Sequence, residues 1–176
     1  LDVDFGARVA IYSKEQLLNG QNFNPTSVRE QLSIFVLSYD SFRTTKKNQV
    51  KHKAYQENGN LSSFAKHTVN SEQLLENVDE TALIQIIRCL NPVMIIDESH
   101  KNVTDLAINT VIRPLNPKII LKVSATPTSE PSYSDIKHNR AGFVEVERED
   151  VIAAGLIKEE IISQTEEDLN VFENID

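Results

Sequence analysis

The fold is decided by one ten-residue stretch, Pro92-Val93-Met94-Ile95-Ile96-Asp97-Glu98-Ser99-His100-Lys101. Its four consecutive apolar residues stop abruptly at two carboxylates, a hydroxyl and an imidazole. A short apolar run after a proline is typical of a central parallel strand covered on both faces. Ligands of open α/β sheets bind outside the carboxyl ends of such strands. We therefore expect Asp97 and Glu98 to face one crevice, where one carboxylate can hold a metal while the other handles a proton.

A second apolar run ends in polar residues a helix-length further along the chain. It spans Ile119–Val123 and leads into Ser124-Ala125-Thr126-Pro127, and the pattern between the two runs predicts a helix from Asn102 to Leu115. Strand, helix and strand joined by short links require a right-handed parallel crossover. The carboxyl ends of both strands should then meet at one edge of one sheet.

These two strand ends resemble motifs II and III of the superfamily two helicases and translocases, with D-E-S-H as the DExH form of motif II and S-A-T as motif III. The resemblance implies that Asp97 holds Mg²⁺, that Glu98 orients and deprotonates the attacking water, and that His100 bridges to motif III. It also implies that Ser124 and Thr126 couple the nucleotide site to the nucleic-acid side. Each short motif alone also fits an ordinary strand end or turn, and it is the ordered pair that favours the helicase.

Within the DExH proteins, the chain most resembles the restriction (Res) subunit of type III restriction-modification enzymes. The resemblance rests on the short gap between the motifs, on Tyr39-Asp40-Ser41-Phe42 and on the tail Asp150–Lys158, and it covers Ile34 to Gln164. It implies a motor that uses ATP and Mg²⁺ to move along double-stranded DNA, a separate nuclease domain that cuts, and a methyltransferase (modification) subunit that recognises the site.

The phosphate-binding loop of such motors has no counterpart in these 176 residues. No G-x-x-x-x-G-K-[ST] occurs, the chain has only five glycines, and the arginines of a second RecA-like domain find no match. Because that loop cradles the β and γ phosphates, we expect the isolated chain to be inactive. The start, Leu1-Asp2-Val3-Asp4, has no Met and suggests an excised fragment. The predicted fold class is α/β, a RecA-like parallel sheet with flanking helices and the P-loop portion missing.

Two other functions fit the same residues. The chain could come from another DExH helicase, including one that acts on RNA. It could also be a non-catalytic scaffold that binds nucleic acid or protein without turnover. Flanking sequence separates the three hypotheses, because a P-loop and an arginine motif indicate a motor and a nuclease motif indicates restriction.

The first third of the chain predicts further α/β structure. A strand is expected at Arg8–Tyr12, a turn or short helix at Ser13–Leu17, a brief helix at Val28–Leu32 and a buried strand at Ile34–Leu37. The junction that follows resembles the region of helicase motifs Ia and Ib, which touch a nucleic-acid backbone. Its candidate contacts are Ser38, Tyr39 and Ser41, although an ordinary strand-to-helix junction has the same composition.

A basic segment follows this junction. Between Thr44 and Asn70 five lysines and one glutamate give a net charge of +4, with almost no hydrophobic period. We expect a mobile surface insertion at 44–70. Lys46 and Lys47 are its first candidate contacts to nucleic-acid phosphates, since clustered cations supply sequence-independent affinity for nucleic acid. A solvated loop that binds nothing fits equally well.

The remaining elements are predicted from periodicity. A helix is expected from Ser71 to Leu90, with a break near Asp79. Residues 128–142 indicate an irregular link. The last predicted elements are a strand at 143–146, a helix at 150–155 closed by Gly155, a strand at 160–164 and a frayed acidic end at 165–176. We expect residues 1–145 to be the C-terminal part of a first RecA-like domain and 146–176 a linker toward a second.

Composition indicates a globular chain, with 40% hydrophobic and 25% charged residues. The net charge of −8 argues against a wholly basic nucleic-acid surface. The single cysteine, Cys89, cannot form an internal disulfide, which fits a reducing cytoplasm, and its apolar surroundings favour a small buried hydrophobe over a nucleophile. No apolar run approaches the roughly 18 residues of a membrane span, and no leader sequence opens the chain.

Overall fold

The structure is a computed structural model that describes residues 8–65, 74–126 and 131–156. The chain divides into two compact units, Leu1–Thr128 and Ser129–Asp176. Residues 129–142, expected as an irregular link, belong to the second unit and contain a short helix at Tyr133–Lys137.

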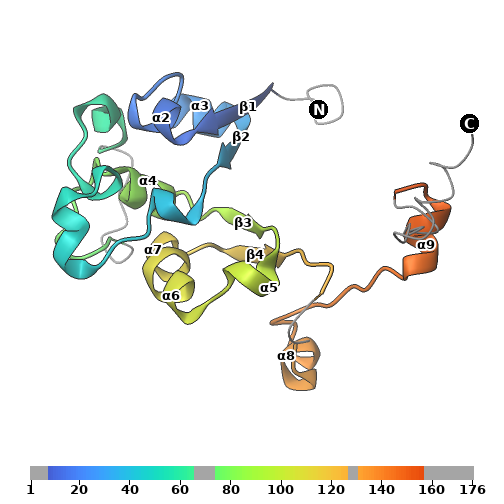
Figure 1. Cartoon of the computed structure of the whole chain (residues 1–176). Coiled ribbons are helices and arrows are strands. Elements are labelled where there is room, and N and C mark those ends of the chain that lie inside the picture. Colours follow the sequence, from blue (N-terminus) through green and yellow to red (C-terminus); the bar gives the residue numbers. More distant parts are fainter. Residues whose placement is uncertain (1–7, 66–73, 127–130, 157–176) are drawn as a thin grey trace, which may run out of the picture. The chain divides into compact units, whose positions relative to one another are not determined.

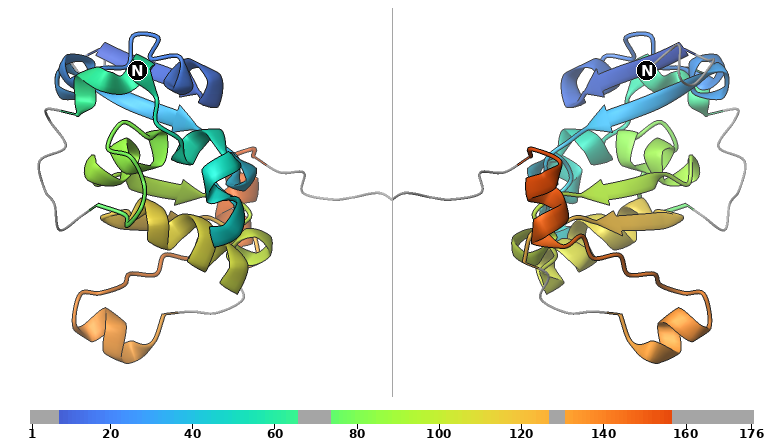
Figure 2. Two further views of the ribbon diagram at one scale, coloured as in Figure 1. Left: turned by 90° about the vertical axis from the view of Figure 1, so that its left-hand side faces the viewer. Right: turned by 90° about the vertical axis from the view of Figure 1, so that its right-hand side faces the viewer.

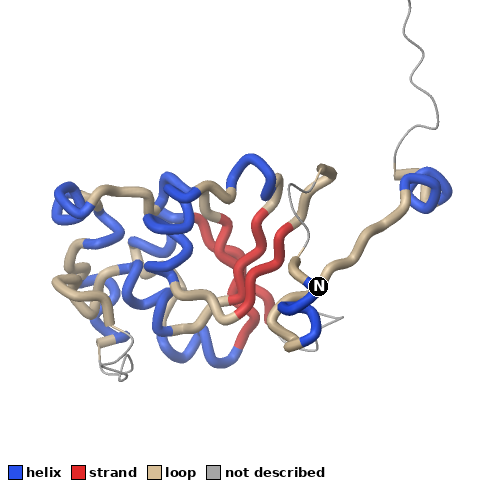
Figure 3. The backbone as a smooth tube through the Cα atoms, turned by 90° about the horizontal axis from the view of Figure 1, so that it is seen from below, coloured by secondary structure: helices blue, strands red, loops and turns tan. Residues whose placement is uncertain are grey.

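Two parallel strand pairs form the β structure of the first unit (Figures 1 and 3). Strand β1 (Arg8–Ser13) pairs with β2 (Gln31–Val36), and β3 (Val93–Ile96) pairs with β4 (Ile119–Lys122). All four were expected near these positions. The expected single sheet is not found, since the described strands form two separate two-stranded sheets. Strand β2 lies next to β3 (Figure 2), but no hydrogen-bonded ladder joins them.

Two short capped helices connect β1 to β2. Helix α2 (Lys14–Leu18) starts at a capping box in which the Ser13 hydroxyl accepts from the Gln16 amide. Helix α3 (Pro25–Glu30) has Pro25 in its first turn and a capping box at Asn24. The helix expected at Val28–Leu32 therefore begins and ends earlier, and β2 already starts at Gln31.

The basic segment, expected as a surface insertion, exposes its described lysines and also contributes apolar side chains to the core. After η1 (Tyr39–Ser41) the chain forms three 3₁₀ helices, η2 (Lys46–Lys51), η3 (Lys53–Tyr55) and η4 (Gly59–Phe64). They bury four side chains completely or almost completely, namely Ala54, Tyr55, Leu61 and Phe64. These four anchors are too irregularly spaced to produce a sequence period. Residues 66–70 lie outside the described part of the chain.

Only the second half of the long predicted helix is helical. Helix α4 spans Leu83–Cys89, whereas residues 74–82 form turns and residues 71–73 are not described. The fully buried Gln85 holds the turns in place, since its Oε1 accepts from the Leu75 amide at 2.9 Å. The Arg88 guanidinium donates to the carbonyls of Arg113 and Pro114 at 3.0 and 2.8 Å, which ties α4 to the end of the next helical segment.

The crossover between β3 and β4 is helical, as expected. It consists of four consecutive segments: α5 (Ser99–Asn102), α6 (Asp105–Ala107), the π-helical η6 (Ile108–Ile112) and α7 (Arg113–Leu115). The Thr104 hydroxyl caps α6, and Asn116 ends α7 in the left-handed conformation at φ 48°. The parallel register then sets Val93 opposite Ile119.

The core of the first unit is built around an aromatic cluster under β1 and β2. Phe23 packs against Tyr12, Phe35 and Phe64 with ring centroids 4.8 to 5.7 Å apart. The Tyr12 hydroxyl is satisfied by donating to the Asn22 carbonyl at 2.9 Å. Helix α4 adds four buried aliphatic side chains, Leu83, Ile84, Ile86 and Ile87.

The β3–β4 pair leaves one apolar face uncovered. Alternate residues on both strands and the residue after β4 are at least half exposed, namely Val93, Ile95, Ile119, Leu121 and Val123. On β3 the intervening Ile96 is only 5% exposed. Residues that alternate in this way share one face of a sheet, so an apolar surface lies open on this side.

The described part of the second unit contains two short helices, α8 (Tyr133–Lys137) and α9 (Arg148–Ala153). Helix α9 and the left-handed Gly155, at φ 69°, agree with the predicted helix and its glycine. The strand expected at 143–146 is absent, since Val144 is 87% exposed and these residues pair with no described strand. The expectations for 160–164 and 165–176 lie outside the described residues. None of the described helices has the length and apolarity needed to cross a bilayer.

Candidate functional site

The site begins where β3 ends in a sharp turn at Glu98. This residue has φ 50° and ψ 44°, a left-handed conformation that side-chain-bearing residues seldom adopt. Its amide donates to the Asp97 Oδ1 at 2.8 Å, and the Asn102 side chain donates to the Asp97 carbonyl at 2.9 Å. These two hydrogen bonds hold the Asp97 carboxylate and the turn at the end of the strand, where Asp97 and Glu98 are both exposed.

Backbone hydrogen bonds join the two strand ends beyond the regular ladder. The Val123 amide donates to the Ile96 carbonyl, and the Ser99 amide donates to the Val123 carbonyl, both at 2.9 Å. The parallel ladder is thereby extended past both strands. This extension places the first turn of α5 directly beside Ser124, as the crossover argument predicted.

His100 and Ser124 make the side-chain contact between the two predicted motifs. His100 Nδ1 lies 2.7 Å from Ser124 Oγ. Ser124 Oγ also accepts from the Thr126 amide at 3.1 Å, which leaves the serine hydroxyl hydrogen free to point at the histidine. Thr126 therefore contributes its backbone amide to this contact, while the residue itself is exposed.

Glu98 lies within reach of two cationic or titratable side chains. Its Oε2 is 3.4 Å from His100 Nδ1 and 3.8 Å from Lys101 Nζ. The Glu98 side chain is 52% exposed and that of His100 only 18%. The carboxylate is thus open to solvent on one side and lies on the other near a histidine that also contacts Ser124.

The donor set fits a hydrated Mg²⁺ rather than a metal enclosed by protein ligands. In the described ranges no group of three or more His, Cys, Asp or Glu side chains gathers. Asp97 is exposed, and its Oδ1 accepts the Glu98 amide. Mg²⁺ keeps several waters and takes one or two carboxylates together with substrate phosphates, and these exposed carboxylates match that requirement.

The nucleic-acid candidates near η1 differ in accessibility. Ser38 is exposed, but Ser41 is only 5% exposed and the Tyr39 hydroxyl is fully buried. Burial removes Ser41 and the Tyr39 hydroxyl from the surface that a nucleic-acid backbone can reach, which corrects the sequence-based expectation. Lys47 is exposed on η2, and the Lys46 side chain lies outside the described atoms.

Sequence reasoning missed two parts of the site. Asn102 was expected only as a helix start, yet its side chain supports the Asp97 carbonyl. The left-handed Glu98 had no sequence signal, because turns of this kind are usually marked by glycine or asparagine. Cys89 ends helix α4 and does not belong to either strand end; burial raises the pKa of its thiol, and Arg88 opposes that shift only in part.

Comparison with known proteins identifies one family. A sequence model of the family described as type III restriction enzyme, res subunit, matches residues 11–129, which is more than half of the chain. The matched region contains both strand ends and the His100–Ser124 contact. No curated protein and no solved structure matches.

Proposed function

Because the chain belongs to the family of type III restriction enzyme res subunits, we propose that it is part of an ATP-dependent motor that couples ATP hydrolysis to DNA translocation and cleavage. The observation that carries the proposal is the 2.7 Å contact between His100 and Ser124, which joins the two predicted helicase motifs. A motor must transmit the state of its nucleotide site to its nucleic-acid site, and in the proposal this contact supplies that link.

Glu98 is the proposed general base. It is exposed at the strand end, so a water can approach it, and its left-handed backbone places the carboxylate 3.4 Å from His100 Nδ1. In phosphoryl transfer the protein mainly positions the attacking water and compensates charge. A carboxylate at this position takes the proton of that water, while Asp97 is the proposed residue that holds Mg²⁺.

The bound Mg²⁺ neutralises charge on the phosphates and orients them for attack. Of the groups that would bind this Mg²⁺, the residues of this chain supply only a carboxylate, that of Asp97. The cradle for the phosphates requires backbone amides and a lysine in a glycine-rich loop, which these 176 residues lack.

We propose that this cradle packs against the open apolar face of the β3–β4 pair. Five exposed apolar side chains share that face, and β4 pairs only with β3 among the described strands. A strand added along β4 would satisfy its free edge, and a helix following that strand would cover Ile95 and Leu121. A glycine-rich loop between the two would then lie near Asp97, at the carboxyl ends of the strands.

Double-stranded DNA is the proposed nucleic acid along which the motor moves. A methyltransferase subunit is the proposed partner, and it would recognise the DNA sequence. Both follow from the family, as does a cytoplasmic location. The exposed Ser38 and Lys47 are the proposed backbone contacts of this chain. An RNA-acting DExH helicase and a scaffold without turnover are the competing functions.

The experiment compares nucleotide hydrolysis with and without nucleic acid in protein that carries both this chain and a phosphate-binding loop. Mg²⁺-dependent ATP hydrolysis should rise when double-stranded DNA is added and should rise less with double-stranded RNA. Stimulation by RNA alone would support the RNA helicase. Absence of hydrolysis with intact nucleotide binding would support the scaffold.

A further inference from the structure

The left-handed turn at Glu98 is strained and has to be held in place. Glu98 has φ 50° and ψ 44°, and a residue with a side chain keeps such a conformation only where the surrounding structure fixes it. The Glu98 amide donates to the Asp97 carboxylate at 2.8 Å, and the Lys101 amide donates to the Glu98 carbonyl at 2.9 Å. Each of these bonds holds one side of the turn.

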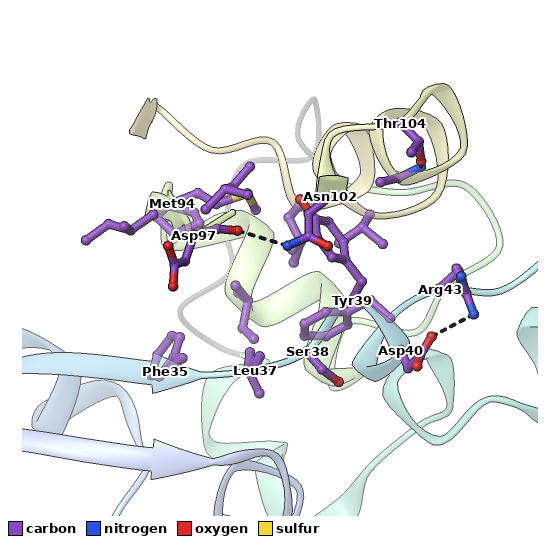
Figure 4. A pocket seen from close by; sticks show the side chains of 18 of the residues that line it. Phe35, Leu37, Ser38, Tyr39, Asp40, Arg43, Met94, Asp97, Asn102 and Thr104 are labelled. Atoms are coloured by element: carbon purple, nitrogen blue, oxygen red, sulfur yellow. Dashed lines mark hydrogen bonds and ion pairs between the residues drawn. The ribbon is translucent and has the colours of Figure 1, made fainter. Parts of the chain in front are cut away.

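Asn102 holds the turn on both sides at once. Its side-chain amide donates to the Asp97 carbonyl at 2.9 Å (Figure 4), and its backbone amide donates to the Glu98 carbonyl at 3.2 Å. These two carbonyls belong to the peptide groups before and after the Glu98 Cα. Asn102 therefore ties both peptide groups that define φ and ψ of Glu98 to the end of helix α5.

Helix formation does not explain the asparagine at this position. Asn102 is the last residue of α5, and asparagine forms helices less readily than alanine. The residue is half-buried, and it lines the same cavity as Asp97. An ionised aspartate has nearly the same shape but carries no donor for a carbonyl. The feature of Asn102 that the structure uses is thus its side-chain N–H group.

The direction of the Glu98 carboxylate depends on this turn. Its side chain is 52% exposed and lies 3.4 Å from His100 Nδ1 and 3.8 Å from Lys101 Nζ. Both distances exceed the length of a strong charge-assisted hydrogen bond, so the backbone contributes much of the orientation. Orientation matters because a displacement of about 1 Å at a reacting group can lower a rate by about a hundredfold.

We propose that Asn102 is a positioning residue for the general base, because its side-chain amide keeps Glu98 in the left-handed turn and so directs the carboxylate toward the attacking water. This inference rests on the proposed role of Glu98 in ATP hydrolysis. Asn102 touches no reacting atom in this scheme and acts through the backbone of Glu98.

Amide hydrogen exchange in the 176-residue chain tests the support of the turn without ATP. Asn102→Ala should speed exchange of the Lys101 amide, which is bonded to the Glu98 carbonyl, by about fivefold, the usual effect of one hydrogen bond. The Ile86 amide in α4, which is bonded to the Ala82 carbonyl, should exchange as in the parent. Faster exchange at both amides would mean that the whole fold is less stable. That result, or unchanged exchange at Lys101, overturns the proposal.

Steady-state ATP hydrolysis by protein that carries the phosphate-binding loop tests the catalytic consequence. Asn102→Ala should lower kcat by about tenfold and change KM for ATP by less than about threefold. Asn102→Asp keeps the shape without the donor and should lower kcat at least as far. In a Glu98→Gln background, Asn102→Ala should lower kcat by less than about twofold, because its effect passes through the base that is already lost.

Asn109→Ala is the matched control. Asn109 is exposed in the same helical crossover, and its carboxamide accepts a hydrogen bond from Arg113 at 2.8 Å, so this change removes a similar bond outside the turn. It should leave both kcat and the exchange of the Lys101 amide at their parental values.

Two kinetic results overturn the proposal: parental kcat in Asn102→Asp, or an equal loss from Asn102→Ala in the parent and in the Glu98→Gln background. A parent protein that does not hydrolyse ATP would refute the proposed function, and the catalytic role of Asn102 with it. The exchange measurement would then still decide whether Asn102 holds the turn, so the two failures are distinguishable.

Discussion

His100 Nδ1 lies 2.7 Å from Ser124 Oγ, and the two residues are 24 positions apart in the sequence. The same nitrogen is 3.4 Å from the Glu98 carboxylate. One imidazole therefore contacts both the proposed general base and the end of the neighbouring strand. A shift of either strand end changes the surroundings of that base, which is the geometry that coupling between two sites requires.

Ser124→Ala should separate nucleotide binding from motion. The substitution removes the Ser124 hydroxyl, which contacts His100 and accepts a hydrogen bond from the Thr126 amide. In protein that carries the phosphate-binding loop, we expect translocation or DNA-stimulated hydrolysis to fall about tenfold or more, with nucleotide affinity changed by less than about threefold. Fluorescent-nucleotide binding and a translocation assay measure the two quantities.

Thr126→Ala is the matched control for this variant, because Thr126 contributes its backbone amide to the contact and its residue is exposed. It should impair motion less than Ser124→Ala, and the double variant should resemble Ser124→Ala. Equal losses of binding and motion in Ser124→Ala would mean that the serine only stabilises the fold.

His52 should make the fold less stable in acid. Burial lowers the pKa of His52 below 6.5, Lys14 lowers it further, and a hydrogen bond to the Asp40 backbone opposes both. The unfolded state then binds the proton first as the pH falls. The contribution of His52 is fully present above pH 6.5 and is lost as the pH falls through the lower, folded-state pKa.

Urea unfolding between about pH 5 and 8 measures this dependence. His52 Nδ1 accepts the Ala54 amide at 3.4 Å, and asparagine is also a good cap, so His52→Asn should keep the helix start and flatten the pH dependence. Lys14→Gln should reduce the dependence without removing it. A pH profile of His52→Asn that overlays the parent would show that His52 does not titrate across the unfolding transition.

Gly20→Ala should destabilise the first unit by more than about 1 kcal/mol. Gly20 has φ 64°, and a Cβ atom there would lie 2.6 Å from the Asn60 carbonyl oxygen. Gly59→Ala is the control, since its Cβ would meet nothing within 4 Å. Chemical denaturation of both variants checks the pair, and equal stability of Gly20→Ala and the parent would contradict the close approach of η4.

Replacing Lys47, Lys51 and Lys53 together by Gln should weaken DNA binding for all sequences alike. All three lysines are exposed on or beside η2 and η3, so the change does not disturb the core. Each lost phosphate contact should reduce the slope of log affinity against log salt by nearly one. Fluorescence anisotropy of labelled DNA at several salt concentrations measures this slope. Lys118→Gln is the control, because Lys118 is exposed just before the start of β4, away from the basic segment in sequence. An unchanged slope would leave the segment as a solvated surface.

The strands and the strand-end motifs were predictable because their signals are local. The runs Val93–Ile96 and Ile119–Leu121 are apolar and short, with a proline just before the first and polar residues after both. Once both were parallel, the crossover fixed their carboxyl ends on one edge, which brought His100 to Ser124. The proximity of the two strand ends followed from topology, whereas the contact of His100 with Ser124 was expected only from the resemblance to the helicase motifs.

The 3₁₀ segment and the turns before α4 were not predictable because their burial depends on distant partners. Phe64 packs on Phe23, about forty residues earlier, and Gln85 bonds the backbone at Leu75 and Val78. Neither contact leaves a period in the local sequence. The helical spacing at residues 74–82 arose from apolar residues that are used in turns instead.

The central claim is that Glu98 activates water for ATP hydrolysis, and Glu98→Gln tests it most directly. Glutamine has nearly the same shape and cannot take a proton, so nucleotide binding should be retained in protein that carries the phosphate-binding loop. The hydrolysis rate should fall by about 10²–10⁴-fold, the usual contribution of a general base. Hydrolysis by the Glu98→Gln protein at the parental rate, or Mg²⁺-dependent hydrolysis by the 176-residue chain alone, would contradict the account.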